Sequence, residues 1–344
     1  MNDNPKISII VPVFNGEEYI SRTLDSILIQ TLIDFEILCV NDSSTDNSLQ
    51  ILEKYQKLDN RINVFSTEIN QGIASKVVNF AIPYCAGKYI FYMSQDDLLS
   101  ENCLENMYNK AVTTKADAVI PDVYYFYENN PVQKTIIGVN GNRDIELTNR
   151  EAVVLSLNWG IAGNALWNAN IVKRFKYAEF GINADEYSVR TFFLACNKVV
   201  FTEGIFFYRQ DNSNAITKKL SYKSFDLPYT HLKHFYFLKE NGFPFEDYSK
   251  ELMKSIRRLI NYTIALQKSR YKFSYSEVLE AEYRIKRCFY SLKEGNVINI
   301  LIAQKGIQKY IFRIAIKNDY KKFFLFCYII RYLQFFTKYT KVRT

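Results

Sequence analysis

The 344-residue sequence predicts an α/β domain built on a mostly parallel sheet with flanking helices, followed by a helical C-terminal region. Short β-branched runs alternate with amphipathic helical spacings over about the first 130 residues, as they do in parallel sheets. From about residue 218 onward the apolar spacing is helical only. Because 48% of the residues are apolar and no low-complexity tract is present, the fibrous and disordered classes are excluded.

Each predicted strand is a short apolar run that ends in turn-forming residues, and each predicted helix has apolar side chains three or four residues apart. In chain order the first part contains strands at 7–13, 35–40, 61–65, 88–93 and 118–126, and helices at 17–30, 46–58 and 75–86. Residues 127–215 are mixed, with a helix expected at 150–157 and a strand at 198–208. Long helices are expected at 252–266, 276–292 and 298–316.

The net charge of +8 is unevenly distributed along the chain. Residues 1–217 hold 18 Lys and Arg against 26 Asp and Glu, net −8, whereas residues 218–344 hold 26 against 10, net +16. We therefore expect a folded domain over 1–217 and a basic, aromatic-rich helical region over 218–344. Such a region suits nucleic acid, an anionic membrane face or an acidic partner, and charge alone does not choose among them.

The cellular compartment is predicted from three features. The six cysteines are scattered without a CxxC pair, which indicates reduced, buried thiols. The N-terminus lacks the pattern of a signal peptide, and the longest apolar run of the basic third, 323–330, is far shorter than the roughly 18 residues of a membrane span. We expect a cytoplasmic protein, with peripheral contact to the inner face of the cell membrane left open.

Polar clusters follow the predicted strands, and open parallel sheets bind ligands at the carboxyl ends of their strands. The clusters contain Asn15 and Glu17 after the first strand, Asp42 after the second, and Ser94, Gln95, Asp96 and Asp97 after the fourth. Adjacent carboxylates at a sheet edge suit Mg²⁺ or Mn²⁺, which implies a substrate carrying a diphosphate. The alternative is that the pair only caps the next helix.

Residues 7 to about 97 resemble the family 2 glycosyltransferases, which are nucleotide-sugar enzymes with the Rossmann-like GT-A fold. The resemblance rests on residues 7–20, 24–27 with Gln30, 36–46, 70–72, and 87–90 leading to Asp96 and Asp97. A fainter likeness continues to about residue 210. The resemblance implies a GT-A catalytic domain over 1–217, with a nucleotide-binding half at 1–97 and an acceptor half at 98–217.

The resemblance also implies a nucleotide site in the first half. Backbone groups at Pro12 and Val13 match positions that cradle the base, Asn15 lies in the same turn, and Glu17 matches a carboxylate that reaches the ribose. Asp42 matches a carboxylate that accepts a hydrogen bond from the uracil ring. The alternatives are structural: Glu17 as a first-turn helix residue and Asp42 as a turn or N-cap residue.

The family's metal motif is Asp-x-Asp, and its last carboxylate matches Asp96. The resemblance therefore implies a divalent cation, Mn²⁺ or Mg²⁺, held by Asp96. The first motif position is Ser94, which has no charge, and Ser94 and Gln95 are expected to contact the donor. Lys76 is the nearest cation that could serve the phosphates, with a solvated helix residue as the alternative.

Inverting glycosyl transfer needs a base that takes the proton of the acceptor hydroxyl. Asp185 and Glu186 match an acidic pair that in relatives usually has the order Glu-Asp, with the Asp as base. Because the order is reversed here, Asp185 is favoured and Glu186 is kept as the second candidate. The alternative is that this acidic pair only marks the exposed start of a helix. Trp159 and Trp167 lie in the same region and either stack on a sugar ring or pack in the core.

Two features of the basic third remain. His231 and His234 lie three residues apart, and with no carboxylate or cysteine expected nearby they are interpreted as ordinary surface or packing residues. The tail 320–336, followed by Lys338, Lys341 and Arg343, is aromatic with basic ends. It suits the headgroup layer of an anionic bilayer, or equally packing against protein.

We therefore predict a metal-dependent, inverting hexosyl- or N-acetylhexosaminyltransferase that moves a sugar, most simply from a UDP-sugar, to a hydroxyl of a glycan or lipid-linked acceptor. By analogy with the family, it would act in bacterial surface polysaccharide synthesis. The main alternative is a non-catalytic scaffold that binds nucleotide sugars. No recognition motif for nucleic acid accompanies the charge, no GxGxxG follows the first strand, and an oligomer stays open.

Overall fold

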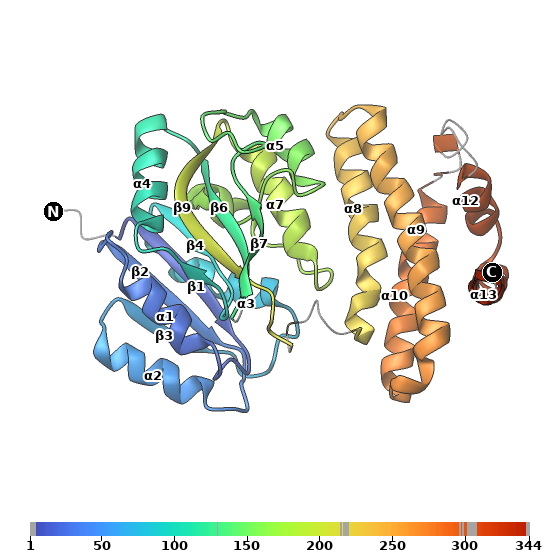
Figure 1. Ribbon diagram of the computed structural model, residues 1–344, viewed down its shortest axis with the longest axis horizontal. Helices are drawn as coiled ribbons and strands as arrows, with labels where there is room; N and C mark the ends of the chain where they lie inside the picture. The colour runs from blue at the N-terminus through green and yellow to red at the C-terminus, as the bar shows by residue number, and fades with distance from the viewer. Residues whose placement is uncertain are drawn as a thin grey trace. The chain divides into compact units, whose positions relative to one another are not determined.

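The computed structural model describes residues 5–341 except 129, 214, 216–219, 296, 298 and 301–307. The chain divides into two compact units by its contacts. The first comprises Met1–Phe180 with Ala184–Ala215, and the second comprises Gly181–Asn183 with Ile216–Thr344. Figure 1 shows a sheet with helices in the first unit and helices in the second.

The first unit is built on one mixed sheet with the strand order β3-β2-β1-β4-β8-β6-β9-β5, and β7 pairs with β6. The strands are β1 Ile7–Val13, β2 Phe35–Asn41, β3 Ile62–Ser66, β4 Tyr89–Tyr92, β5 Leu98–Leu99, β6 Ala118–Tyr127, β7 Asn130–Ile136, β8 Leu166–Asn168 and β9 Val199–Arg209. The first four are parallel to one another, with Ile9 of β1 opposite both Ile37 and Phe91. The predicted alternation over the first part of the chain is therefore confirmed.

The second half of the sheet departs from a simple parallel order. The three-residue strand β8 lies antiparallel between β4 and β6, so β6 does not pair with β4. β9 then runs parallel to β6, and β5 pairs antiparallel with β9. The short strands β5 and β8 were not predicted, because a run of two or three residues carries too little periodicity to identify a strand.

Helices flank the sheet, and those predicted at 17–30, 46–58, 75–86 and 150–157 are found close to these positions, whereas the other three were not predicted. The helices of this unit are α1 Ile20–Leu28, α2 Ser48–Leu58, α3 Ala74–Ala81, α4 Cys103–Thr114, α5 Asn149–Ser156, α6 Ala169–Phe175 and α7 Ala184–Ala195. The helix expected at 75–86 instead ends at Ala81 and continues as a 3₁₀ turn, Ile82–Tyr84. Pro83 explains the change, since proline has no backbone N–H to donate within an α-helix.

The second unit is helical and has a core of its own. It contains the 3₁₀ turns η2 Tyr222–Asp226 and η3 Arg270–Lys272 and the helices α8 Leu227–Glu240, α9 Phe245–Ser269, α10 Tyr275–Glu294, α12 Gln308–Lys317 and α13 Tyr320–Lys341. Helices α8, α9 and α10 pack side by side (Figure 1). Leu232, Phe235 and Phe289 are among their fully buried side chains. Part of the helix expected at 298–316 lies outside the described residues.

Polar residues at their N-termini explain where two helices of the second unit begin. α9 begins seven residues before the predicted 252, with Glu246 and Asp247 in its first turn, where carboxylates favour the helix dipole. α10 begins with a capping box, in which Ser274 and Glu277 satisfy each other's backbone N–H groups. These polar residues extend the helices beyond the apolar pattern that predicted them.

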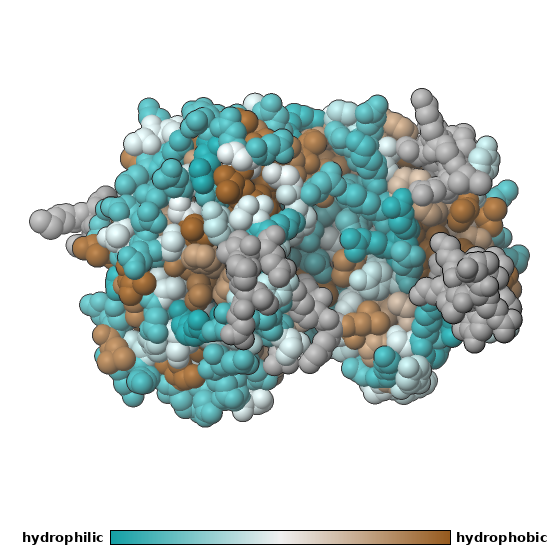
Figure 2. All heavy atoms as spheres, in the orientation of Figure 1, coloured by the Kyte–Doolittle hydropathy of each residue, from teal (hydrophilic) through white to brown (hydrophobic). Residues whose placement is uncertain are grey.

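All six cysteines are free and buried, which confirms the prediction of reduced thiols. Burial raises the pKa of the Cys39 thiol to about 12, so this side chain is chemically inert. Among the described residues, no helix is both long and apolar enough to cross a membrane. On the face shown in Figure 2, hydrophilic residues cover most of the surface and hydrophobic ones form small groups between them.

A buried arginine at the end of β9 fixes the turn that follows β4. The Arg209 side chain is 1% exposed, and its guanidinium forms ion pairs with Glu128 at 2.7 Å and Asp211 at 3.1 Å. Its Nε donates to the Asp96 carbonyl at 2.9 Å, and its backbone N–H donates to Asp97 Oδ1 at 3.0 Å. One residue therefore holds the Asp96–Asp97 turn through both side chain and backbone.

We expect Arg209→Lys to lower the free energy of unfolding by roughly 2–4 kcal/mol, because an ammonium cannot make this set of buried, directed hydrogen bonds. The matched control is Arg22→Lys, since Arg22 also pairs with Glu128 but its side chain is 52% exposed. For Arg22→Lys the free energy of unfolding should fall by less than about 1 kcal/mol. Urea denaturation of both variants measures the difference, and equal losses would contradict the role given to Arg209.

Candidate active site

The turn after β1 is locked to the turn after β2. Asn15 has a left-handed backbone, with φ 48°; its N–H donates to Ser44 Oγ at 3.0 Å, and its Oδ1 accepts from Thr45 N at 2.8 Å. The Val13 carbonyl accepts from Asp42 N at 2.7 Å. The backbone around Pro12 and Val13 is therefore held rigidly at the carboxyl end of the sheet.

The two carboxylates at these turns have different surroundings. Glu17 is exposed, and its Oε2 accepts from the Asn47 backbone and side chain at 3.0 and 2.8 Å, so it caps the start of α2. Asp42 is 5% exposed, and its carboxylate accepts from Thr67 Oγ1, Asn70 Nδ2 and Gln71 N at 2.8–3.0 Å. The loop at 67–71 thereby fixes the direction of the Asp42 carboxylate.

The turn after β4 connects this region to the rest of the rim. The Gln95 side-chain amide pairs with the backbone of Phe14, accepting from its N–H at 2.8 Å and donating to its carbonyl at 3.0 Å. A Cβ at Gly16 would lie 2.5 Å from Gln95 Oε1, so glycine lets the two turns approach. Gln95 therefore bridges two strand ends, with its amide already engaged by the protein.

Asp96 and Asp97 lie in different environments. Asp96 is half-buried, and its Oδ2 accepts from Asn212 Nδ2 at 2.6 Å. Asp97 is 2% exposed, and burial, together with the charge of Asp96, raises its pKa well above the usual range. Only Asp96 therefore offers an accessible carboxylate at this turn.

A cavity of about 140 Å³ lies beside this turn. Ser94 and Asp97 line it together with Asp185 and Glu186 from α7, and the aromatic residues Tyr92, Trp159, Tyr177 and Tyr208 also contribute to its wall. Trp159 is 40% exposed. Trp167 is 1% exposed and packs against Phe192 and Phe193, which makes it mainly a core residue.

Asp185 and Glu186 are adjacent but electrostatically distinct. Asp185 Oδ1 is buried without a hydrogen-bond partner among the described residues, and burial, together with the charge of Glu186, raises the pKa of Asp185 to about 6. Glu186 instead lies 3.7 Å from the buried Arg190 guanidinium. A carboxylate whose pKa lies near neutrality and that has an unused oxygen is suited to accept a proton.

Three residues complete the comparison with the sequence predictions. The sequence analysis assigned no site role to Arg209 or Asn212. The signal for Arg209 was its position as a charged residue at the end of a long apolar strand, whereas Asn212 had no such signal. Lys76 is half-buried on α3 and makes no hydrogen bond or ion pair within the described part of the chain. The structure brings Ser94 and Asp97 to the same cavity as Asp185 and Glu186.

Comparison with known proteins identifies the family. Residues 8–173 match the model of glycosyl transferase family 2. The chain is 30% identical over 217 residues to glycosyltransferase GlyG of Streptococcus pneumoniae, which covers 59% of this chain and 70% of GlyG. It is 34% identical over 119 residues to the Staphylococcus aureus poly(ribitol-phosphate) β-N-acetylglucosaminyltransferase TarP, covering 33% of this chain and 36% of TarP.

The fold has a counterpart among solved structures. The crystal structure of S. aureus TarS in complex with UDP-GlcNAc superposes with a TM-score of 0.68 over 95% of this chain and 91% of that chain, at 16% identity. Other relatives are longer, and the chain spans 30% of S. pneumoniae glycosyltransferase GlyA. The family motifs, the identity with GlyG and the shared fold lead to one conclusion: this chain is a glycosyltransferase of family 2 with the GT-A fold.

Proposed function

We propose that this enzyme moves a hexose or N-acetylhexosamine from a UDP-sugar to a hydroxyl of a glycan or lipid-linked acceptor, with inversion, in the synthesis of a bacterial surface polysaccharide. The observation that carries the proposal is the cavity that Asp185, with its raised pKa, lines together with Ser94 and Asp97, which lie on either side of Asp96 in the turn after β4; Asp96 itself is not among the lining residues. Further support comes from TarP, named for N-acetylglucosaminyl transfer to poly(ribitol phosphate), and from TarS, crystallised with UDP-GlcNAc.

In this proposal the nucleotide lies on the rim formed by the turns after β1 and β2. The backbone at Pro12 and Val13 cradles the base, with Asn15 holding the turn's shape. The fixed Asp42 carboxylate accepts the ring N–H of uracil, and Glu17 accepts from the ribose while it caps α2. Lys76 is the cation proposed for the phosphates.

A divalent cation fits the turn after β4. Mg²⁺ and Mn²⁺ need only one or two protein carboxylates, with water and substrate phosphate as the other ligands. Asp96 would hold the cation, since its carboxylate is accessible and oriented by Asn212, whereas Asp97 is buried. A bound cation supplies positive charge where the leaving diphosphate develops negative charge. The Ser94 hydroxyl and the Gln95 region contact the donor.

Asp185 is the proposed base. The acceptor hydroxyl oxygen attacks the anomeric carbon, its proton passes to the Asp185 carboxylate, and the bond from that carbon to the diphosphate breaks on the opposite side. UDP leaves, and the configuration at the anomeric carbon inverts. Glu186, paired with Arg190, keeps negative charge beside Asp185 and so helps to raise its pKa. The exposed face of Trp159 offers a stacking surface for a sugar ring.

The C-terminal helix α13 supports the proposal of a contact with an anionic membrane. Exposed apolar or aromatic side chains on α13 include Leu325, Tyr328, Ile329 and Tyr332, which are 47–58% exposed. Lys321 and Lys322, in the first turn of the same helix, are also exposed. Apolar side chains beside basic ones are typical of helices that lie in a headgroup layer. The side chains of Lys338 and Lys341, and all of Arg343, lie outside the described residues.

Replacing Asp185 by Asn should lower kcat by about 10²–10⁴-fold, because the amide cannot accept the acceptor proton, while the thermal midpoint is kept or raised. In the unaltered enzyme, kcat/KM should fall about tenfold per pH unit below pH 6, as the base becomes protonated. Steady-state pH profiles and thermal melts measure both effects. If Glu186→Gln abolishes turnover and Asp185→Asn does not, the assignment of the base is reversed.

Thermal melts with a panel of UDP-, GDP- and dTDP-sugars, with and without Mn²⁺, should show stabilisation by a UDP-sugar that depends on Mn²⁺. At a donor concentration about 100-fold above Kd, binding should raise the free energy of unfolding by about 2.7 kcal/mol. Asp96→Ala should abolish this gain and lower turnover about 100-fold, whereas Glu53→Ala, which removes an exposed carboxylate from α2, should do neither. If the unaltered protein binds the donor but shows no turnover, it is a non-catalytic scaffold and the proposed activity is wrong.

The full chain should sediment with vesicles containing anionic lipid and not with neutral vesicles. Replacing Leu325 and Ile329 together by Gln should weaken this binding by at least about tenfold, because each buried CH₂ contributes about 0.8 kcal/mol. Replacing the exposed Ile33 and Ile69 of the first unit by Gln is the control and should leave binding unchanged. Equal binding to neutral vesicles, or equal loss in both double variants, would exclude this membrane contact.

A further inference from the structure

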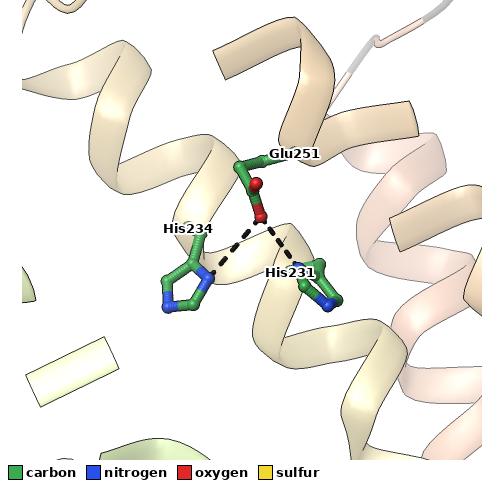
Figure 3. Close-up of side chains that lie close together, drawn as sticks. All are labelled: His231, His234 and Glu251. Atoms are coloured by element: carbon green, nitrogen blue, oxygen red, sulfur yellow. Dashed lines mark hydrogen bonds and ion pairs between the residues drawn. The ribbon is translucent and has the colours of Figure 1, made fainter. Parts of the chain in front are cut away.

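The second unit brings together His231, His234 and Glu251, the first two on α8 and the third on α9 (Figure 3). The sequence-based expectation that no carboxylate lies near the histidines is wrong. Glu251 follows His234 by seventeen residues and lies on the next helix, so sequence distance conceals the contact. We propose that this cluster is a binding site for a transition-metal ion of the Zn²⁺ class.

The three side chains converge on one point. His231 Nδ1 lies 2.8 Å from Glu251 Oε2, and His234 Nδ1 lies 3.7 Å from the same oxygen. All three potential ligand atoms lie within 4.8 Å of one another. Figure 3 shows both imidazole rings turned toward that single oxygen. In a tetrahedral zinc site with bonds of 2.0–2.2 Å the ligand atoms are about 3.3–3.6 Å apart, so small side-chain rotations complete the geometry.

Helix geometry and burial hold the ligands in place. Residues three apart on a helix lie on one face, so both histidines of α8 are presented to α9 together. The side chains of His231, His234 and Glu251 are only 13%, 2% and 2% exposed. His231 is the most exposed of the three, so in this proposal an ion reaches the site from its side.

The chemistry of the three ligand atoms determines which metal ion they prefer. A neutral imidazole carries one proton, and moving that proton from Nδ1 to Nε2 frees the Nδ1 lone pair for a metal. The third ligand atom is a carboxylate oxygen, Glu251 Oε2, which lies within reach of Nδ1 of both rings. Two nitrogens and one oxygen suit Zn²⁺, whereas Mg²⁺ prefers oxygen ligands only.

Lys254 makes the carboxylate a single-atom ligand. Its ammonium lies 2.6 Å from Glu251 Oε1, which leaves Oε2 for the metal. The Lys254 side chain is 33% exposed and can move toward solvent when an ion adds positive charge. With three protein ligands the fourth position is filled by water, and the bound ion ties α8 to α9. Without an ion, the same contacts form a buried hydrogen-bonded network that links the two helices.

The test uses the full chain carrying Asp96→Ala, which removes the carboxylate proposed for the catalytic cation. After treatment with chelator, Zn²⁺ is titrated by calorimetry, and Co²⁺ is titrated by its visible absorption. The comparison variant adds His231→Asn and His234→Asn, because the Asn amide can donate from nearly the position of Nδ1 but cannot replace an imidazole ligand. The chain has only two histidines, so any nitrogen ligation by imidazole must come from this site.

We expect one Zn²⁺ per chain, a Co²⁺ spectrum of a low-symmetry site with nitrogen ligands, and a higher thermal midpoint with Zn²⁺. The His→Asn variant should bind at least about tenfold more weakly and lose the spectrum. Absence of stoichiometric binding in the protein with both histidines, or equal binding in the variant, would overturn the proposal in favour of the hydrogen-bonded network. If the variant does not fold, the Co²⁺ spectrum of the parent protein decides alone.

Discussion

The ion pairs and hydrogen bonds of the buried Arg209 guanidinium are the interactions on which the geometry of the candidate active site depends. β4 and β9 are not neighbours in the sheet, because β8 and β6 lie between them. Backbone pairing therefore cannot hold the turn after β4 against the end of β9, and the side chain of Arg209 does so, with Glu128 and Asp211 neutralising its charge. Burying this cation is favourable only because each of these partners is present.

The same site shows how adjacent carboxylates acquire different properties. Asp96 is accessible and oriented by Asn212, while Asp97 is buried against the β9 backbone. Asp185 has a buried oxygen that finds no partner in the described part of the chain, while Glu186 lies beside Arg190. Environment thus distinguishes the two members of each pair: one keeps an accessible or unpaired carboxylate, which suits the chemistry proposed for it, and the other is tied to neighbouring groups, a common way for enzymes to separate roles.

The second unit combines a core of its own with the excess positive charge of the chain. Its apolar residues bury one side of each helix, so the basic residues remain on the outside. Glu251 is an exception, because this buried carboxylate links α9 to the two histidines of α8. A polar cluster at this depth fixes the register of two helices, whether or not it holds an ion.

The sequence by itself determined the parallel half of the sheet, the family, the reduced thiols and most helix positions, because these depend on local periodicity, turn residues and motifs within short stretches. The tertiary structure decided the rest. It inserted β8 between β4 and β6, brought Arg209 and Asn212 to Asp96, and brought Glu251 to His231. These contacts join residues 20–116 positions apart, and no local pattern encodes which distant side chains will meet when the core closes.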